Sequence, residues 1–289
     1  MECSSACISC LLDHEYERVK EIDDEELKKH YLKDVCKIIG ESKDGETAVH
    51  LCYLFNNLYD ETFKPTHNKF VQINHSFNKL VMDMAEEIED KINKSSDPIK
   101  TALIYSRAGN YIDYGAVYNI STDKFFKLLN RDDTLDDLNY TAFCNKLASS
   151  KTLLLLADNC GEIVLDKLLL KTIKRHYPDL DMTVMVKKSN VLNDATSKDA
   201  EEVGMKKVAR IIDTGNCIAG CDLRYISNQA QQALQDADII LAKGQANFET
   251  LWQTDYDCFF SFLCKCPYFA DKFDVDIYQG MFMHQVSLT

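Results

Sequence analysis

Apolar residues recur every three or four positions through the first half of the chain, which is the spacing of helices that bury one face. The segments with this spacing cover residues 7–19, 27–39, 47–58, 68–94 and 99–105. Gly40 offers a stop to the second segment, and Pro98 can open the last. Strand-like alternation of apolar and polar residues is lacking here. We therefore expect an all-helical N-terminal region over residues 1–149.

After residue 149 the pattern changes, and short apolar runs alternate with helical spacing. The run Thr152–Ala157 is followed by a polar turn, and a helix is predicted from Ile163 to His176. Further strands are predicted at residues 182–187, 208–212, 237–242, 259–263 and 277–283, with helices at 193–203 and 227–233 between them. This alternation favours a mostly parallel sheet with helices on both faces. We therefore predict an α/β domain over residues 150–289.

Polar residues stand at or after the ends of four predicted strands. In chain order they are Asp158-Asn159, Asn193-Asp194, Asp213-Thr214 and Lys243. The turns that follow parallel strands face the same side of a sheet, so these residues should converge in one crevice. Carboxylate and carboxamide oxygens suit Mg²⁺ or Mn²⁺, and Lys243 beside them can meet a phosphate oxygen. Gly161 leaves room for close backbone approach, and the helix that follows it favours an anion at its N-terminus.

Each of these residues also has a simpler interpretation. Asp158-Asn159 and Asn193-Asp194 are both good helix N-caps, and Asp213-Thr214 with Gly215 can form a plain turn. Lys243 on its own can be a solvated side chain. The joint occurrence of these residues at consecutive strand ends is what favours a functional site over four separate local features.

Composition and missing motifs exclude several classes of function. The formal net charge of −13 argues against nucleic acid or an anionic membrane surface as the partner, because both require a basic surface. The chain has neither an export signal nor a stretch of about 20 apolar residues, so we expect a cytoplasmic protein. The dinucleotide-binding, P-loop and nucleophile-elbow motifs are also missing.

Twelve cysteines are a high count for a chain without an export signal, which favours reduced thiols over disulfides. Cys7 and Cys10 form a Cys-x-x-Cys pair, and Cys264 and Cys266 lie near the other end of the chain. The spacing of the second pair does not fit a zinc knuckle. A four-thiolate zinc site stays an alternative, but we favour a thiol cluster that includes Cys7, Cys10 and Cys266, or ordinary packing.

The sequence resembles the damage-control phosphatases, metal-dependent enzymes formerly catalogued as a domain of unknown function. The matching segments are residues 107–113, 158–162, 193–196, 214–215 and 243–251, the last of which reads Lys-Gly-Gln-Ala-Asn-Phe-Glu-Thr-Leu. Cys7-x-x-Cys10 and Lys265-Cys266-Pro267 are similar to features of the stand-alone, mostly prokaryotic branch. Residues 216–223 match poorly, so the resemblance does not define the substrate preference.

The resemblance implies a Rossmann-like three-layer fold on which the helical region packs. It also implies a divalent cation, Mn²⁺, Co²⁺, Ni²⁺ or Mg²⁺, held by Asp158, Asn159 and Asp194. The expected substrates are small phosphate monoesters, such as sugar phosphates or damaged phosphorylated metabolites. The residues expected to bind the substrate are Asn110, Gly161, Glu162, Asn193, Thr214, Lys243 and Asn247.

Our mechanistic hypothesis makes Asp158, Asp194 and Lys243 the catalytic residues. The metal acts as a Lewis acid on a phosphoryl oxygen, and Lys243 helps to neutralise charge in the transition state while water attacks phosphorus. A covalent route with Asp158 as nucleophile is chemically possible. Two other functions stay open: a non-catalytic sensor of phosphorylated metabolites or redox state, and a methyltransferase that uses S-adenosylmethionine. The absence of a glycine-rich turn after the first strand counts against the methyltransferase.

Overall fold

The chain divides into two compact units, Met1–His67 and Asn68–Thr289. The computed structural model describes residues 1–64, 68–111, 127 and 134–286. The change from helices to strands falls at Thr152, close to the boundary predicted near residue 149, whereas the division into compact units falls at His67. The helices after His67 therefore pack in the same unit as the sheet.

The first unit consists of three helices, α1 (Ser5–Val19), α2 (Glu25–Glu41) and α3 (Ala48–Phe63). Each helix begins after a side chain that accepts a hydrogen bond from a backbone N–H of its first turn, namely Ser4, Asp24 and Thr47. The apolar faces of the three helices meet in a small core that includes Val19 and Phe55.

The second unit begins with the helices α4 (Asn68–Met82), α5 (Ala85–Lys94), α6 (Pro98–Ala108), η1 (Gly109–Tyr111) and α8 (Asp137–Ser149). The single helix predicted over residues 68–94 is interrupted between α4 and α5. The Met84 N–H bonds to the Val81 carbonyl, so the last turn of α4 tightens before a new helix starts. Apolar spacing continues on both sides of this break, which explains why the sequence pattern did not reveal it.

Six strands form one sheet in the order β3-β2-β1-β4-β5-β6. The strands are β1 (Thr152–Leu156), β2 (Asp181–Val186), β3 (Arg210–Asp213), β4 (Ile239–Lys243), β5 (Cys258–Leu263) and β6 (Gly280–Gln285). The first five are parallel, and β6 pairs antiparallel with β5. The predicted mostly parallel sheet is therefore confirmed.

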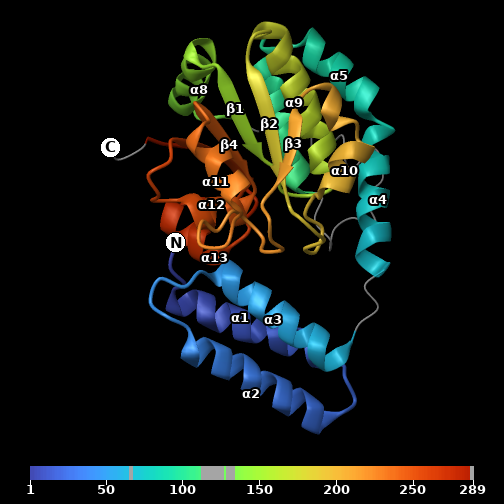
Figure 1. Ribbon diagram of the computed structural model, residues 1–289, viewed down its shortest axis with the longest axis vertical. Coiled ribbons are helices and arrows are strands. Elements are labelled where there is room, and N and C mark those ends of the chain that lie inside the picture. The colour runs from blue at the N-terminus through green and yellow to red at the C-terminus, as the bar shows by residue number, and fades with distance from the viewer. Residues whose placement is uncertain (65–67, 112–126, 128–133, 287–289) are drawn as a thin grey trace. The chain divides into compact units, whose positions relative to one another are not determined.

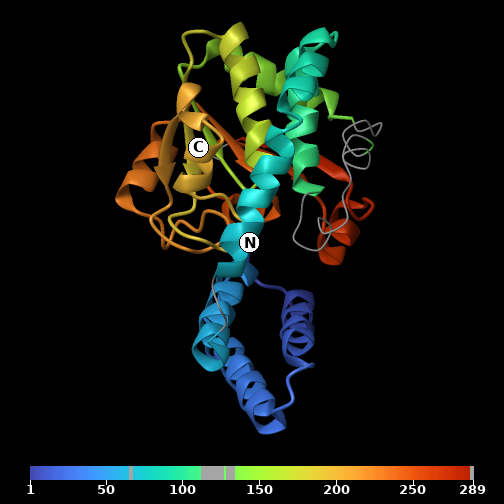
Figure 2. The same cartoon turned by 90° about the vertical axis from the view of Figure 1, so that its right-hand side faces the viewer.

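Helices cover both faces of this sheet, as predicted. They are α9 (Glu162–His176), α10 (Ser197–Glu202), η3 (Met205–Lys207), α11 (Asn228–Gln235), α12 (Gln245–Leu251) and α13 (Pro267–Phe273). Figures 1 and 2 show α11 and α12 on one face and α9 with α6 on the other. The chain builds β1, β2 and β3 outward in one direction and then returns to place β4 on the other side of β1. Right-handed crossovers in opposite directions put helices on opposite faces.

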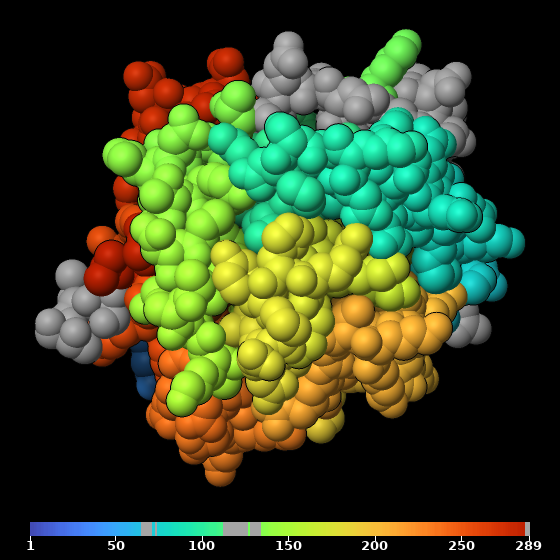
Figure 3. Space-filling model, turned by 90° about the horizontal axis from the view of Figure 1, so that it is seen from above, coloured from blue at the N-terminus to red at the C-terminus, as the bar shows by residue number. Residues whose placement is uncertain are grey.

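The central strands are buried on both faces, which explains why β1 reads as a continuous apolar run. Leu153, Leu155 and Ile239 belong to the main core together with residues of α6 and α9. Figure 3 views the end of the sheet where strands begin, with α5 and α8 on either side of the connection from α9 to β2. In the described ranges of the chain, no helix is both long and apolar enough to span a membrane.

Candidate active site

The predicted metal ligands meet where the strand order of the sheet reverses, between β1 and β4. Strand β1 pairs with β2 on one side and β4 on the other, so its carboxyl end lies at the switch point of the sheet, where ligands bind in open α/β sheets. Asp158 and Asn159 leave β1 at this point, and a β-bridge joins Asn159 to Asp194. The Ala195 N–H donates to the Asp158 carbonyl at 2.7 Å. The structure thus brings Asp158, Asn159 and Asp194 together.

The loop that carries Asp194 differs from its prediction. The sequence suggested that Asn193 opens a helix, but α10 begins only at Ser197, after Thr196 and Asp199 form a capping box. Asn193 instead accepts a hydrogen bond from the Cys160 N–H through its carbonyl, at 2.8 Å. The reciprocal capping box of Thr196 and Asp199 is a better helix start than the Asn193-Asp194 pair, so α10 begins after Thr196. Residues 193 and 194 therefore lie outside the helix and pair with the loop after β1.

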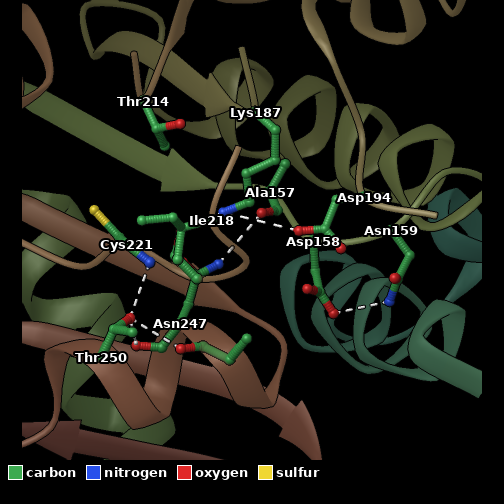
Figure 4. A network of polar contacts seen from close by, with 12 residues as sticks. Ala157, Asp158, Asn159, Lys187, Asp194, Thr214, Ile218, Cys221, Asn247 and Thr250 are labelled. Atoms are coloured by element: carbon green, nitrogen blue, oxygen red, sulfur yellow. Dashed lines mark hydrogen bonds and ion pairs between the residues drawn. The ribbon is translucent and has the colours of Figure 1, made fainter. Parts of the chain in front are cut away.

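Two amides hold the Asp158 carboxylate. Asn110 and Asn159 donate through their Nδ2 atoms to the same oxygen, Oδ2, at 2.7 and 2.8 Å, as Figure 4 shows for Asn159. Burial raises the pKa of Asp158 well above its ordinary value, and repulsion from Glu162 and Asp194 raises it further. Attraction to Lys265 and Lys187 opposes this increase. The site therefore concentrates negative charge away from water.

This concentration of negative charge fits a divalent cation. In the described part of the chain, no three His, Cys, Asp or Glu side chains are grouped so that they alone could hold a metal. The set of ligands here is mixed, with carboxylates from Asp158 and Asp194 and an amide from Asn159. The Asn159 nitrogen is used by Asp158 and Glu162, which leaves its carbonyl oxygen as the atom suited to a cation. Hard oxygen ligands of this kind suit Mg²⁺ or Mn²⁺.

Lys243 lies at the end of β4, but its ammonium is directed into the protein. The Nζ atom contacts Glu162 Oε1 at 2.5 Å, Asp166 Oδ1 at 2.8 Å and the Ser106 carbonyl at 3.2 Å. The side chain is fully buried. Burial alone would lower the pKa of Lys243, but attraction to Asp166 and Glu162 outweighs burial and raises it. Burial also raises the pKa of Asp166 to about 6, with attraction to Lys243 opposing the increase.

These three contacts use every proton of the Lys243 ammonium. The phosphoryl contact predicted for Lys243 would therefore require one of them to break. In this arrangement Lys243 holds Glu162 in place through Oε1. The other carboxylate oxygen of Glu162, Oε2, accepts hydrogen bonds from Asn110 at 2.9 Å and from Asn159 at 3.3 Å. Both amides also bind Asp158, so Lys243 acts on the site through Glu162.

Two supporting residues were missed by the sequence analysis. Lys187 follows β2, and its ammonium lies 3.9 Å from Asp194 Oδ2. The sequence analysis made Lys187 the last residue of the strand predicted over residues 182–187, so it was not counted among the polar residues that follow strands, whereas β2 ends at Val186. Asn78 in α4 accepts from the Gly161 N–H at 2.8 Å and donates to Asp199 at 3.3 Å. A polar residue that the helix buries completely gives no signal in the spacing of apolar residues.

Of the remaining predicted residues, Thr214 follows β3 and Asn247 lies in α12 after β4. Asn247 donates to the carbonyls of Ala157 and Lys243, and Thr214 donates to the carbonyl of Asn216. Among the predicted site residues that the structure describes, buried amide atoms without a hydrogen-bond partner occur at Asn110 Oδ1, Asn193 Nδ2 and Asn247 Oδ1. Polar atoms left this way in a protein interior are available to a ligand. Residues 112 and 113 of the matching segment around Asn110 lie outside the described residues.

The predicted thiol cluster stays a prediction. Cys7 and Cys10 lie in α1 of the first unit, and the Cys7 sulfur accepts from the Ser4 hydroxyl at 3.1 Å. Cys266 is the residue before α13 in the second unit. None of the twelve cysteines, all of which lie in the described ranges, forms a disulfide.

Gly244 is required by the position of Asp158. It has φ +80°, and a Cβ atom there would lie 2.0 Å from Asp158 Oδ2. We expect Gly244→Ala to displace the carboxylate, because both the backbone and the available space disfavour a side chain. Metal affinity measured by calorimetry should fall about tenfold or more. Gly40→Ala is the matched control, because Gly40 lies in α2 with open space around it. Unchanged metal affinity in Gly244→Ala would contradict this assignment.

Comparison with known proteins places these observations in a family. The model of the damage-control phosphatase ARMT1-like domain matches residues 3–280. A damage-control phosphatase from Archaeoglobus fulgidus is 31% identical over 87% of this chain and 88% of its own length. One from Pyrococcus horikoshii is 25% identical over 95% of each chain. The crystal structure of a DUF89 family protein from Pyrococcus horikoshii superposes with a TM-score of 0.79 at 24% identity, covering 98% of this chain and 99% of that chain, which supports the fold.

Proposed function

Because this chain belongs to the damage-control phosphatase ARMT1-like family, we propose that it hydrolyses small phosphate monoesters with the help of a divalent metal ion. The substrates are sugar phosphates or damaged phosphorylated metabolites. The observation that carries this proposal is the buried, mutually repelling pair Asp158 and Asp194 at the switch point of the sheet. Ionising both members of such a pair is favourable only when a cation balances their charge.

Asp158, Asn159 and Asp194 would hold the metal, which is Mn²⁺, Mg²⁺, Co²⁺ or Ni²⁺. When bound, the ion supplies Lewis acidity toward a phosphoryl oxygen. The protein's own contribution is orientation. Asn110 and Asn159 fix one oxygen of Asp158, and Glu162 in turn fixes both amides.

The attacking group in this proposal is water, oriented by one of the two carboxylates. A direct nucleophilic attack by Asp158 is less favoured, because its Oδ2 atom already accepts two hydrogen bonds. Hydrogen bonds to a carboxylate oxygen reduce its electron density and restrict its movement toward phosphorus. Lys243 keeps a role in this mechanism as a positioning residue that holds Glu162 and Asp166.

The test is hydrolysis of a generic aryl phosphate by the purified protein. We expect turnover with Mn²⁺ or Mg²⁺, and loss of turnover when a chelator removes the metal, because the two carboxylates then repel each other and the substrate. Adding the metal back should restore activity. A panel of sugar and cofactor phosphates, assayed with each of the four metals, then ranks substrates.

Two outcomes would contradict the proposal. Turnover that persists unchanged in excess chelator would remove the metal from the mechanism. Tight binding of a phosphorylated metabolite without any hydrolysis, under all four metals, would favour a non-catalytic sensor instead.

A further inference from the structure

We propose that Lys187, and not Lys243, donates to the phosphoryl group of the substrate. This inference rests on the proposed function and adds a substrate-contacting residue to it. Lys187 directly follows β2, the strand beside β1, and its ammonium lies 3.9 Å from Asp194 Oδ2. Figure 4 shows it directed toward Asp194.

The contacts of Lys187 leave its ammonium with unused donors. The side chain is 3% exposed, so water does not solvate it freely. The Nζ atom donates to the Gly220 carbonyl and lies 3.9 Å from Asp194 Oδ2, which is an ion pair but not a hydrogen bond. Two of its three protons therefore have no hydrogen-bond acceptor among the residues that the structure describes. A buried ammonium in this state is suited to accept a ligand that brings oxygen atoms.

Lys243 is the natural comparison, because it is the other fully buried lysine at a strand end. All three of its protons have acceptors, and two of those acceptors are the carboxylates Glu162 and Asp166. A phosphoryl oxygen would have to displace a carboxylate or the Ser106 carbonyl. The lysine with free donors is Lys187, and it lies on the side of Asp194.

Charge balance leads to the same assignment. Asp158 and Asp194 carry two negative charges, which a divalent cation would neutralise. Lys187 would then retain a positive charge without a carboxylate of its own, while Lys243 would still face Glu162 and Asp166. A phosphate monoester brings about two negative charges, and an ammonium is a strong partner for a phosphate oxygen.

The decisive variant is Lys187→Gln, tested by calorimetry with Mg²⁺ and with inorganic phosphate. We expect the affinity of the Mg²⁺-loaded protein for phosphate to fall about 10- to 100-fold. The affinity for Mg²⁺ itself should not fall, because the substitution removes a cation near Asp194. Lys188→Gln is the matched control, since Lys188 is the next residue and its side chain is exposed; both affinities should stay at the wild-type values.

A structural role through Gly220 predicts a different pattern. In that case Lys187→Gln would weaken Mg²⁺ and phosphate binding together, and that result would overturn the proposal. Equal phosphate affinity in Lys187→Gln and wild type would also overturn it, while leaving the proposed function intact. If the wild-type protein, loaded with metal, neither binds phosphate nor hydrolyses the aryl ester, the proposed function fails together with this inference.

A measurement on the wild-type protein covers the case in which Lys187→Gln does not fold. With ¹⁵N-labelled lysine and Mg²⁺ present, inorganic phosphate should shift the Nζ signal of Lys187 and leave that of Lys243 in place. Lys187→Arg, which keeps the charge, assigns the signal and should retain phosphate affinity to within about tenfold. A shift at Lys243 alone would overturn the proposal.

Discussion

Asp158→Asn and Asp194→Asn are each expected to abolish measurable Mg²⁺ or Mn²⁺ binding and to reduce turnover of an aryl phosphate by about a hundredfold to a thousandfold. Each substitution keeps the size of the side chain and removes one of the two negative charges that would hold the cation. Calorimetry with the metal and steady-state kinetics measure the two effects. Full activity in either variant would contradict the metal assignment.

The stability of metal-free Asp158→Asn should change in the opposite direction from its activity. Burial, together with repulsion from Glu162 and Asp194, raises the pKa of Asp158, so the ionised group destabilises the metal-free fold at neutral pH. Removing the charge should make metal-free Asp158→Asn more stable than metal-free wild type in urea unfolding. Asp181→Asn serves as the control, because Asp181 is exposed at the opposite end of the sheet. A general loss of folding in Asp158→Asn would show as lower stability and would separate misfolding from lost chemistry.

Lys243→Met is expected to destabilise the protein by about 3–5 kcal/mol at pH 8, because it leaves Glu162 and Asp166 buried without their cation. For a unit of this size the melting temperature should fall by about 6–20 °C. A second substitution, Asp166→Asn, should recover part of the loss by removing one of the two uncompensated charges. Lys206→Met is the control, because Lys206 pairs with Glu201 on the exposed surface, where an ion pair contributes little.

The loss in Lys243→Met should depend on pH in a defined direction. Burial raises the pKa of Asp166 to about 6 in the folded protein, above its ordinary value of 3.8. The folded state then binds more protons than the unfolded state between these values, so the stability that protonated Asp166 provides is lost as pH rises through about 6. In Lys243→Met this dependence of stability on pH should become stronger. The loss of stability relative to wild type should therefore be smaller at pH 5 than at pH 8. A deficit that is independent of pH would argue that packing, and not charge, explains the variant.

Much of the second unit could be predicted from the sequence because its signals are local. The run around Leu154 is apolar since β1 is buried on both faces, and the polar turn after it marks the strand end. The convergence of Asp158 with Asp194 followed from the geometry of parallel strands alone. The capping box at Thr196 was also visible in the sequence, but the Asn-Asp pair before it was given priority.

The direction of the Lys243 side chain could not be predicted, because it depends on partners from two helices. Glu162 and Asp166 are on one face of α9, and Ser106 is in α6, far away in sequence. Asn78 was missed for the same reason, since its partners Gly161 and Asp199 lie more than 80 residues further along. Apolar spacing shows which face of a helix is buried, but it does not show which polar groups meet there.

The hydrogen bonds around Asp158 also bear on how the protein would acquire its metal. Asn110, Glu162 and Lys243 hold the carboxylate in place through protein contacts alone. Little reorganisation would therefore accompany loading, and the rate of exchange should follow the release of water from the incoming ion. Three oxygen ligands also distinguish poorly among ions of similar size. We therefore expect the cellular supply of divalent ions, more than these three ligands, to decide which metal is used in the cell.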